Sequence, residues 1–214
     1  LKLGQDYEVL MLSIDPLEDV QKASSDRDTY FERYFSLINN CLVAGTGSVL
    51  EAAADKIVRV ASSGGKIILV GNGGSAAMAS HVAVDLTKAA GVRAINFNEA
   101  DLLTCLANDY GYENWVAKAL EFYSDAGDLL IVISSSGESK NILNGVKQAK
   151  AMNLGTITLS GFASENPLRK RGNLNLWVDS KSYNIVEMTH HIWLVAIVDF
   201  IIERRSANEN PSHG

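Results

Sequence analysis

Hydrophobic residues return along this chain in two rhythms. Between about residues 26 and 62 they recur every three or four positions, a spacing typical of helices with one apolar face. From residue 66 onward, short continuous apolar runs alternate with helical stretches. These runs predict strands at 66–70, 94–97, 129–133, 156–159 and 174–178. Because continuous apolar strands separated by helices are typical of parallel sheets, we expect a parallel sheet covered on both faces.

The first and last predicted helices have unusually wide apolar surfaces. Aromatic residues cluster at 30–35, and the last helix, at about 184–205, is apolar almost all round. Such helices need burial on several sides, so we expect an oligomer with a helical core. The longest apolar run near the C-terminus, Ile192–Val198, is far too short to span a bilayer. The sequence therefore predicts no membrane segment and a cytoplasmic location.

Composition supports a globular α/β protein. The chain has 214 residues, of which 47% are hydrophobic and 21% charged. We predict a three-layer sandwich around a five-stranded, flavodoxin-like parallel sheet, formed by residues 26–206 with two leading helices. Residues 1–25 would be an N-terminal extension and 207–214 a frayed tail. The net charge of -6 argues against a nucleic-acid surface, but backbone amides can still bind a small anion.

Two loops of unusual composition follow two of the predicted strands. The first reads GNGGS (71–75) and the second SSSGES (134–139). Glycines let the backbone approach an anion, serine hydroxyls add donors, and each loop opens a helix whose N-terminus favours phosphate. We therefore predict one phosphate site at the carboxyl ends of the strands. Its expected residues are Asn72, Gly73, Gly74, Ser75, Ser134, Ser135, Ser136 and Ser139.

Other interpretations of these loops remain open at this point. Ser75 and Ser136 could be helix N-caps with no ligand. Residues Gly71 to Ala76 also fit the dinucleotide-binding pattern G-x-G-x-x-A, with Glu99 near the end of the second strand. That pattern leaves the triple serine of the second loop unexplained. A Walker A loop is excluded because no Gly-Lys-Ser/Thr follows the strand.

Three motifs resemble the sugar isomerase (SIS) domain family, and within it the phosphoheptose isomerases. They are GNGGSAAMASHVAVDL (71–86), LANDYGYEN (106–114) and ISSSGESKNIL (133–143). The resemblance implies a homotetramer with active sites at subunit interfaces, and serines 75, 134, 135, 136 and 139 around a phosphate. It places Asn72 and Asp109 near the sugar hydroxyls. It also implies aldose–ketose isomerisation through an enediol, in lipopolysaccharide biosynthesis, and many family members carry zinc.

The chain departs from the family pattern at the acid–base positions. The family's His-x-x-x-Glu appears here as His81 and Asp85, whose spacing puts both side chains on one helix face. In the last helix, a Gln and a His of the phosphoheptose isomerases correspond by this resemblance to Val186 and Leu194. Tyr183 likewise replaces an Asp. The family's zinc and acid–base set is therefore incomplete.

Two residues of the last helix offer substitutes. Glu187 and His190 lie in YNIVEMTH (183–190), which resembles a stretch of SIS proteins encoded with surface-polysaccharide genes. His190 shares a helix face with the two replaced positions, so it is a candidate for proton transfer. Its alternative is a buried structural histidine. His191 points about 100° away and is expected to be structural or at the surface. The expected catalytic residues are His81, Asp85, Glu187 and His190, and the possible zinc ligands His81, Asp85 and His190.

The sequence thus predicts an enzyme whose partner is a phosphorylated sugar. The expected reaction is isomerisation of sedoheptulose 7-phosphate or a related sugar phosphate. The alternative is a non-catalytic SIS scaffold or regulator that binds a sugar phosphate, for example with a replication initiator. A third and weaker interpretation is an NAD-dependent enzyme.

Overall fold

The computed structural model describes residues 19–44 and 47–209, with side chains from 29 to 207 apart from 45–46. By compactness the chain divides into two units, Leu1–Asn40 and Cys41–Gly214. Most of the predicted extension (1–18) and the end of the predicted tail (210–214) lie outside the described residues. The second unit contains the sheet and the candidate site.

Five parallel strands form one sheet in the order β2-β1-β3-β4-β5, which confirms the predicted fold class. The strands are β1 (Ile67–Gly71), β2 (Ala94–Asn96), β3 (Leu129–Ser134), β4 (Gly155–Ser160) and β5 (Leu174–Trp177). The helices are α2 (Asp19–Val43), α3 (Gly47–Ser62), α4 (Gly74–Lys88), α5 (Ala100–Tyr110), α6 (Trp115–Tyr123), α7 (Lys140–Ala151) and α8 (Tyr183–Glu209).

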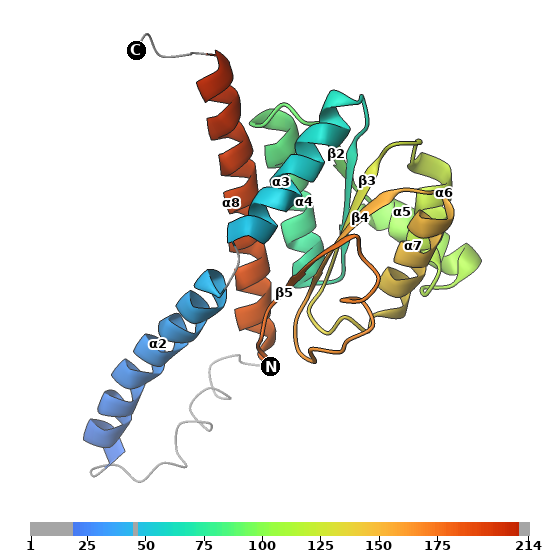
Figure 1. Cartoon of the computed structure of the whole chain (residues 1–214). Coiled ribbons are helices and arrows are strands. Elements are labelled where there is room, and N and C mark those ends of the chain that lie inside the picture. Colours follow the sequence, from blue (N-terminus) through green and yellow to red (C-terminus); the bar gives the residue numbers. More distant parts are fainter. Residues whose placement is uncertain (1–18, 45–46, 210–214) are drawn as a thin grey trace. The chain divides into compact units, whose positions relative to one another are not determined.

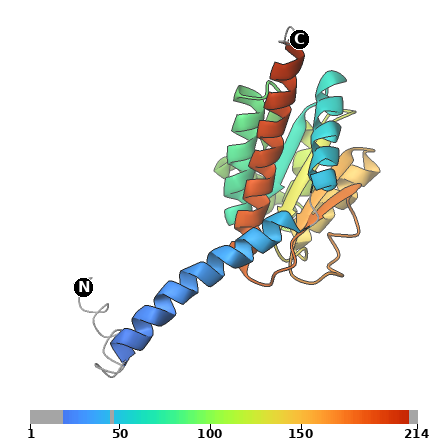
Figure 2. The ribbon, with the colours of Figure 1, turned by 60° about the vertical axis from the view of Figure 1, so that its left-hand side comes forward.

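Alternate residues of the strands pack into two separate hydrophobic cores. Ile67 and Leu69 of β1 face one core, which also contains residues of α3, α4 and α8. Ile68 and Val70 face the other, with residues of α5, α6 and α7. Figures 1 and 2 show these two helical layers on opposite sides of the sheet. All five residues of β1 are buried, because a continuous apolar run serves both faces.

Helix α8 is longer than the apolar run at its centre suggests. Tyr183–Ala207 is long and apolar enough to cross a membrane by length and composition, with a mean hydropathy of 1.7. The length argument made from Ile192–Val198 alone was therefore wrong. Half of its most apolar stretch is buried inside the fold. There Trp193, Leu194 and Ile197 belong to the hydrophobic core that α8 shares with α3 and α4. The helix thus has the packing of a core helix.

The strand order places the two glycine-rich and serine-rich loops beside each other. Strands β1 and β3 are neighbours, and Gly71 at the end of β1 pairs in register with Ile133 of β3. From β1 the chain goes to β2 on one side, whereas from β3 it goes to β4 on the other. The loops after β1 and β3 therefore flank the point where the strand order reverses, and ligands bind at such points in open α/β sheets.

Candidate functional site

A small polar pocket lies where the loops after β1 and β3 meet. Its volume is about 100 Å³. We call it the phosphate pocket. It is lined by Asn72, Ser75, Ile133, Ser134, Ser135, Ser136, Ser139, Tyr183 and Glu187. The structure thus brings together the five serines and the asparagine that the sequence predicted.

The loop after β1 brings backbone to the pocket because of its glycines. Gly73 has φ 55° and ψ -123°, a positive-φ backbone conformation that residues other than glycine rarely adopt. It precedes α4 as its N-cap, and it makes no side-chain capping bond. A Cβ atom on Gly74 would collide with the carboxylate of Glu187. Gly73 and Gly74 therefore present bare backbone at the start of α4, directly before Ser75.

The second loop turns tightly around Gly137, whose φ is 68°. The Gly137 amide donates to the carbonyl and hydroxyl oxygens of Ser134, at 3.0 and 3.2 Å. Ser134 Oγ in turn donates to Ser139 Oγ at 3.3 Å. Within the described residues, the buried hydroxyl of Ser135 has no hydrogen-bond partner. A buried hydroxyl without a partner costs free energy, so it is a strong candidate to bind a ligand.

The interpretation of these serines as helix caps is not supported. Ser75 lies inside the first turn of α4, where Gly73 is the N-cap. Ser139 is the N-cap of α7 but makes no side-chain capping bond. Ser136 lies before that cap, and its hydroxyl accepts a hydrogen bond from the Glu138 amide at 3.2 Å. Ser75, Ser136 and Ser139 therefore all line the pocket, and neither helix is capped by one of their side chains.

Helix α8 presents a different face to the pocket from the one the sequence suggested. Tyr183 and Glu187 line the phosphate pocket. Val186 and Leu194, the positions assigned to the family's Gln and His, are 0% and 2% exposed and belong to the hydrophobic core. The face that meets α4 begins one residue later than expected. Glu187, predicted as a catalytic residue, thus lies at the phosphate pocket.

One turn further along that face, His191 contacts the predicted pair of α4. His81 Nδ1 lies 2.9 Å from His191 Nε2, and His81 Nε2 lies 3.1 Å from Asp85 Oδ2. The rings meet edge to face, with centroids 5.1 Å apart. Burial lowers the pKa of His191, and His81 lowers it further, while Asp85 raises it. We call Asp85, His81 and His191 the histidine chain.

The expectation for the two neighbouring histidines was wrong. His190, the predicted proton carrier, is 0% exposed and packs near Trp193 in the core. Its Nε2 donates to the Ser160 carbonyl oxygen at 3.1 Å, and its Nδ1 has no partner in the described part of the chain. Burial lowers the pKa of His190 to about 4. His190 is therefore a neutral structural histidine. His191, and not His190, lies beside His81 and Asp85.

The residues proposed for zinc do not fit a metal site. Both ring nitrogens of His81 are engaged, one by His191 and one by Asp85. His190 is held in the core by its bond to the β4 carbonyl. Among the residues that the structure describes, no three His, Cys, Asp or Glu side chains are grouped so that they could hold a metal ion.

Asp109 is placed apart from the phosphate pocket. It lies exposed near the end of α5, where its carboxylate accepts a hydrogen bond from Asn108 Nδ2 at 2.9 Å. It is not among the residues that line the phosphate pocket.

The sequence did not predict Asn141 and Tyr112, which hold Asn72 by hydrogen bonds. The nearest signal was their position inside the two motifs 106–114 and 133–143.

The chain is similar to proteins of one family. The family described as the SIS domain matches residues 29–161. A phosphoheptose isomerase of Helicobacter pylori is 35% identical over 173 residues, covering 78% of this chain and 88% of that protein. A probable phosphoheptose isomerase of Thermoplasma acidophilum is 38% identical over 144 residues, covering 64% of this chain and 78% of that protein.

Solved structures show the same similarity in three dimensions. A phosphoheptose isomerase from Francisella tularensis superposes with a TM-score of 0.76 at 27% identity, covering 84% of this chain and 97% of that one. One from Neisseria gonorrhoeae gives a TM-score of 0.71, also at 27% identity, and covers 85% and 99% of the two chains.

Proposed function

This chain belongs to the SIS domain family, in its phosphoheptose isomerase-like branch, and we propose that it interconverts the ketose and aldose forms of a sugar phosphate. Sedoheptulose 7-phosphate or a close relative is the proposed substrate. The observation that carries the proposal is the convergence of the 71–75 and 134–139 loops on one pocket. Hydroxyls and helix N-termini there match the acceptor oxygens of a phosphate.

The spacing along α4 and α8 supports a sugar of about this length. Gly74 faces Glu187 at the phosphate pocket, and His81 meets His191 further along the same two helices. His81 lies seven positions after Gly74, which corresponds to about 10 Å along a helix. An extended seven-carbon chain is of that order. A substrate anchored by its phosphate would thus bring its carbonyl end to the histidine chain.

The histidine chain supplies an ordered path for a proton. When His81 Nε2–H donates to Asp85, its Nδ1 accepts from His191 Nε2–H. His191 Nδ1 is then the basic nitrogen, and its lowered pKa keeps it unprotonated near neutral pH. We assign it the removal of the proton from the carbon next to the carbonyl, while the carbonyl oxygen takes up a proton, which gives the enediol. Return of a proton to the former carbonyl carbon, with loss of the proton from the other enediol hydroxyl, completes the isomerisation. Glu187 is the carboxylate at the phosphate end of this site.

Assembly and location belong to the same proposal. We propose a homotetramer that acts in the cytoplasm on a precursor of lipopolysaccharide. The aromatic residues of α2 support assembly, since Tyr30, Phe31 and Phe35 are 50% to 63% exposed. The position of Asp109 outside the phosphate pocket of its own chain is consistent with a site that a second subunit completes.

The test is proton exchange with solvent. The protein is incubated with sedoheptulose 7-phosphate in heavy water, with and without added zinc, and deuterium next to the carbonyl is measured by NMR. We expect exchange by the wild type and a loss of about 10²–10⁴-fold in His191→Gln. Lys88→Gln, an exposed change further along α4, is the matched control and should keep full activity.

Two outcomes would contradict the proposal in different ways. Phosphate-sugar binding by the wild type without any exchange would favour the non-catalytic SIS scaffold. Full exchange by His191→Gln would leave the isomerase standing but remove His191 as the base.

A further inference from the structure

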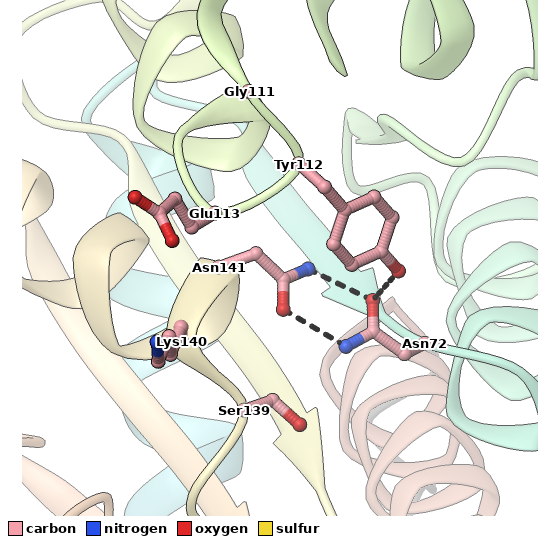
Figure 3. A pocket seen from close by; sticks show the side chains of 7 residues that line it. All are labelled: Asn72, Gly111, Tyr112, Glu113, Ser139, Lys140 and Asn141. Atoms are coloured by element: carbon pink, nitrogen blue, oxygen red, sulfur yellow. Dashed lines mark hydrogen bonds between the residues drawn. The ribbon is translucent and has the colours of Figure 1, made fainter.

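Asn72 stands between the phosphate pocket and a larger cavity. The larger cavity has a volume of about 430 Å³, and Figure 3 shows it from close by. Asn72 and Ser139 line both spaces. The lining of the larger cavity is Asn72, Gly111, Tyr112, Glu113, Ser139, Lys140 and Asn141. The side chain of Asn72 is therefore part of a wall shared by both.

Three hydrogen bonds fix the carboxamide of Asn72 (Figure 3). Asn141 Nδ2 donates to Asn72 Oδ1 at 2.8 Å, and Asn72 Nδ2 donates back to Asn141 Oδ1 at 3.0 Å. Tyr112 Oη also donates to Asn72 Oδ1, at 3.2 Å. The two carboxamides thus exchange two hydrogen bonds, and the tyrosine adds a second donor to the Asn72 oxygen.

This pattern leaves Asn72 with one kind of polar group to offer. A carbonyl oxygen has two lone pairs, and Asn141 and Tyr112 engage both. One of the two N–H groups of Asn72 is used by Asn141, so the second N–H is what remains for a ligand. A phosphate carries acceptor oxygens, so an N–H attracts it and a carbonyl oxygen repels it.

Resting on the proposed function, we propose that Asn141 and Tyr112 are positioning residues that lock Asn72 with its N–H toward the phosphate pocket. The two supports come from different elements. Asn141 is the second residue of α7 and is 2% exposed, whereas Tyr112 lies in the turn between α5 and α6 and is 54% exposed. The end of β1, the start of α7 and this turn therefore act together on one side chain.

The proposal separates action through Asn72 from a merely structural role. If Asn141 acts through Asn72, its effect on phosphate affinity disappears once the Asn72 amide is gone. A structural effect of Asn141 would persist in that background. A double-mutant cycle measures this difference directly.

The experiment measures binding of inorganic phosphate by calorimetry, so it does not depend on turnover. Asn141→Leu removes both amide bonds at similar volume and should weaken phosphate binding about five- to tenfold. In the Asn72→Ala background the same change should alter affinity less than about twofold. Tyr112→Phe should follow the same pattern with a smaller loss, of about threefold. Gln148→Leu, two turns further along α7, is the matched control and should change nothing.

Kinetics with the sugar phosphate provides a second readout. Asn141→Leu should raise KM by the same factor as it weakens phosphate binding, while kcat stays within about twofold. Equal losses of phosphate affinity in both backgrounds would overturn the positioning role. Absence of phosphate binding by the wild type would instead overturn the phosphate pocket, and the positioning role with it. If Asn141→Leu fails to fold, the exposed Tyr112→Phe completes the cycle.

Discussion

The two ends of the same sheet carry polar clusters of opposite character. At the amino ends of β1 and β3, Lys66 Nζ contacts Asp125 and Asp128, both at 2.6 Å. Asp128 also accepts hydrogen bonds from the backbone amides of Lys66 and Asp125, each at 2.8 Å. At the carboxyl ends, the buried hydroxyl of Ser135 has no partner among the described residues. One cluster is complete without a ligand and the other is not.

This difference teaches how to separate structural from functional polar groups. A buried charge that is fully paired stabilises the fold only as long as every partner stays. A buried hydroxyl without a partner makes no such contribution and carries a cost until something binds it. Changes at the amino end should therefore act on stability, and changes at the carboxyl end on ligand affinity.

The largest effect on stability is expected from Asp128→Ala. The change leaves Lys66, whose side chain is 12% exposed, beside two backbone amides that have lost their acceptor. We expect a cost of about 3–5 kcal/mol in the free energy of unfolding, measured by urea denaturation. Phosphate affinity of the folded protein should stay the same.

Asp125→Ala is the matched control for this prediction. The Asp125 side chain is 83% exposed, so its ion pair with Lys66 should contribute less than about 1 kcal/mol. Equal costs for the two aspartates would show that burial does not decide the strength of the cluster.

The free energy of unfolding is expected to depend on pH through His190. Its pKa is about 4 in the folded chain and 6.5 in its ordinary state, so the unfolded state takes up a proton first as the pH falls. The stabilisation by neutral His190 is complete above pH 6.5 and is lost progressively as the pH falls toward 4. The loss amounts to about 3 kcal/mol.

Urea denaturation between pH 7 and pH 4.5 checks this expectation. His190→Gln keeps a donor for the Ser160 carbonyl but cannot take up the proton, so its stability should fall less over that range. The same pH dependence in both proteins would assign the loss to other groups.

The contrast between His190 and His191 also shows what the sequence could predict. The two loops were placed correctly because their composition and their position after strands are local features, and the strand order then brings them together. The phase of α8 was not predictable in the same way. A helix that is apolar almost all round has no polar face to fix its rotation, so an error of one residue turned the site by about 100°.

The hydrogen bonds of Asn72 could not be predicted from the sequence, for a related reason. Residues 72, 112 and 141 are far apart in the sequence, and they meet only because β1 and β3 are neighbours and α5–α6 returns to the same edge. No spacing rule links them. Contacts of this kind follow from topology, whereas the serine loops follow from composition.

The smallest effect on stability is expected from Ser135→Ala, at the carboxyl ends of the strands. The change removes a buried hydroxyl that has no partner within the described chain and that costs free energy while unbound, so the free energy of unfolding should not fall and should rise by at most about 1 kcal/mol. Phosphate affinity should fall about tenfold, because Ser135 lines the pocket and we expect its free hydroxyl to donate to the bound phosphate. Ser160→Ala is the matched control, since Ser160 is also buried but accepts hydrogen bonds from Asn166 and Asn175, each at 3.3 Å. It should cost about 1–2 kcal/mol in stability. If Ser135→Ala were the more destabilising of the two, the unpartnered hydroxyl would be structural and the difference between the two ends of the sheet would disappear.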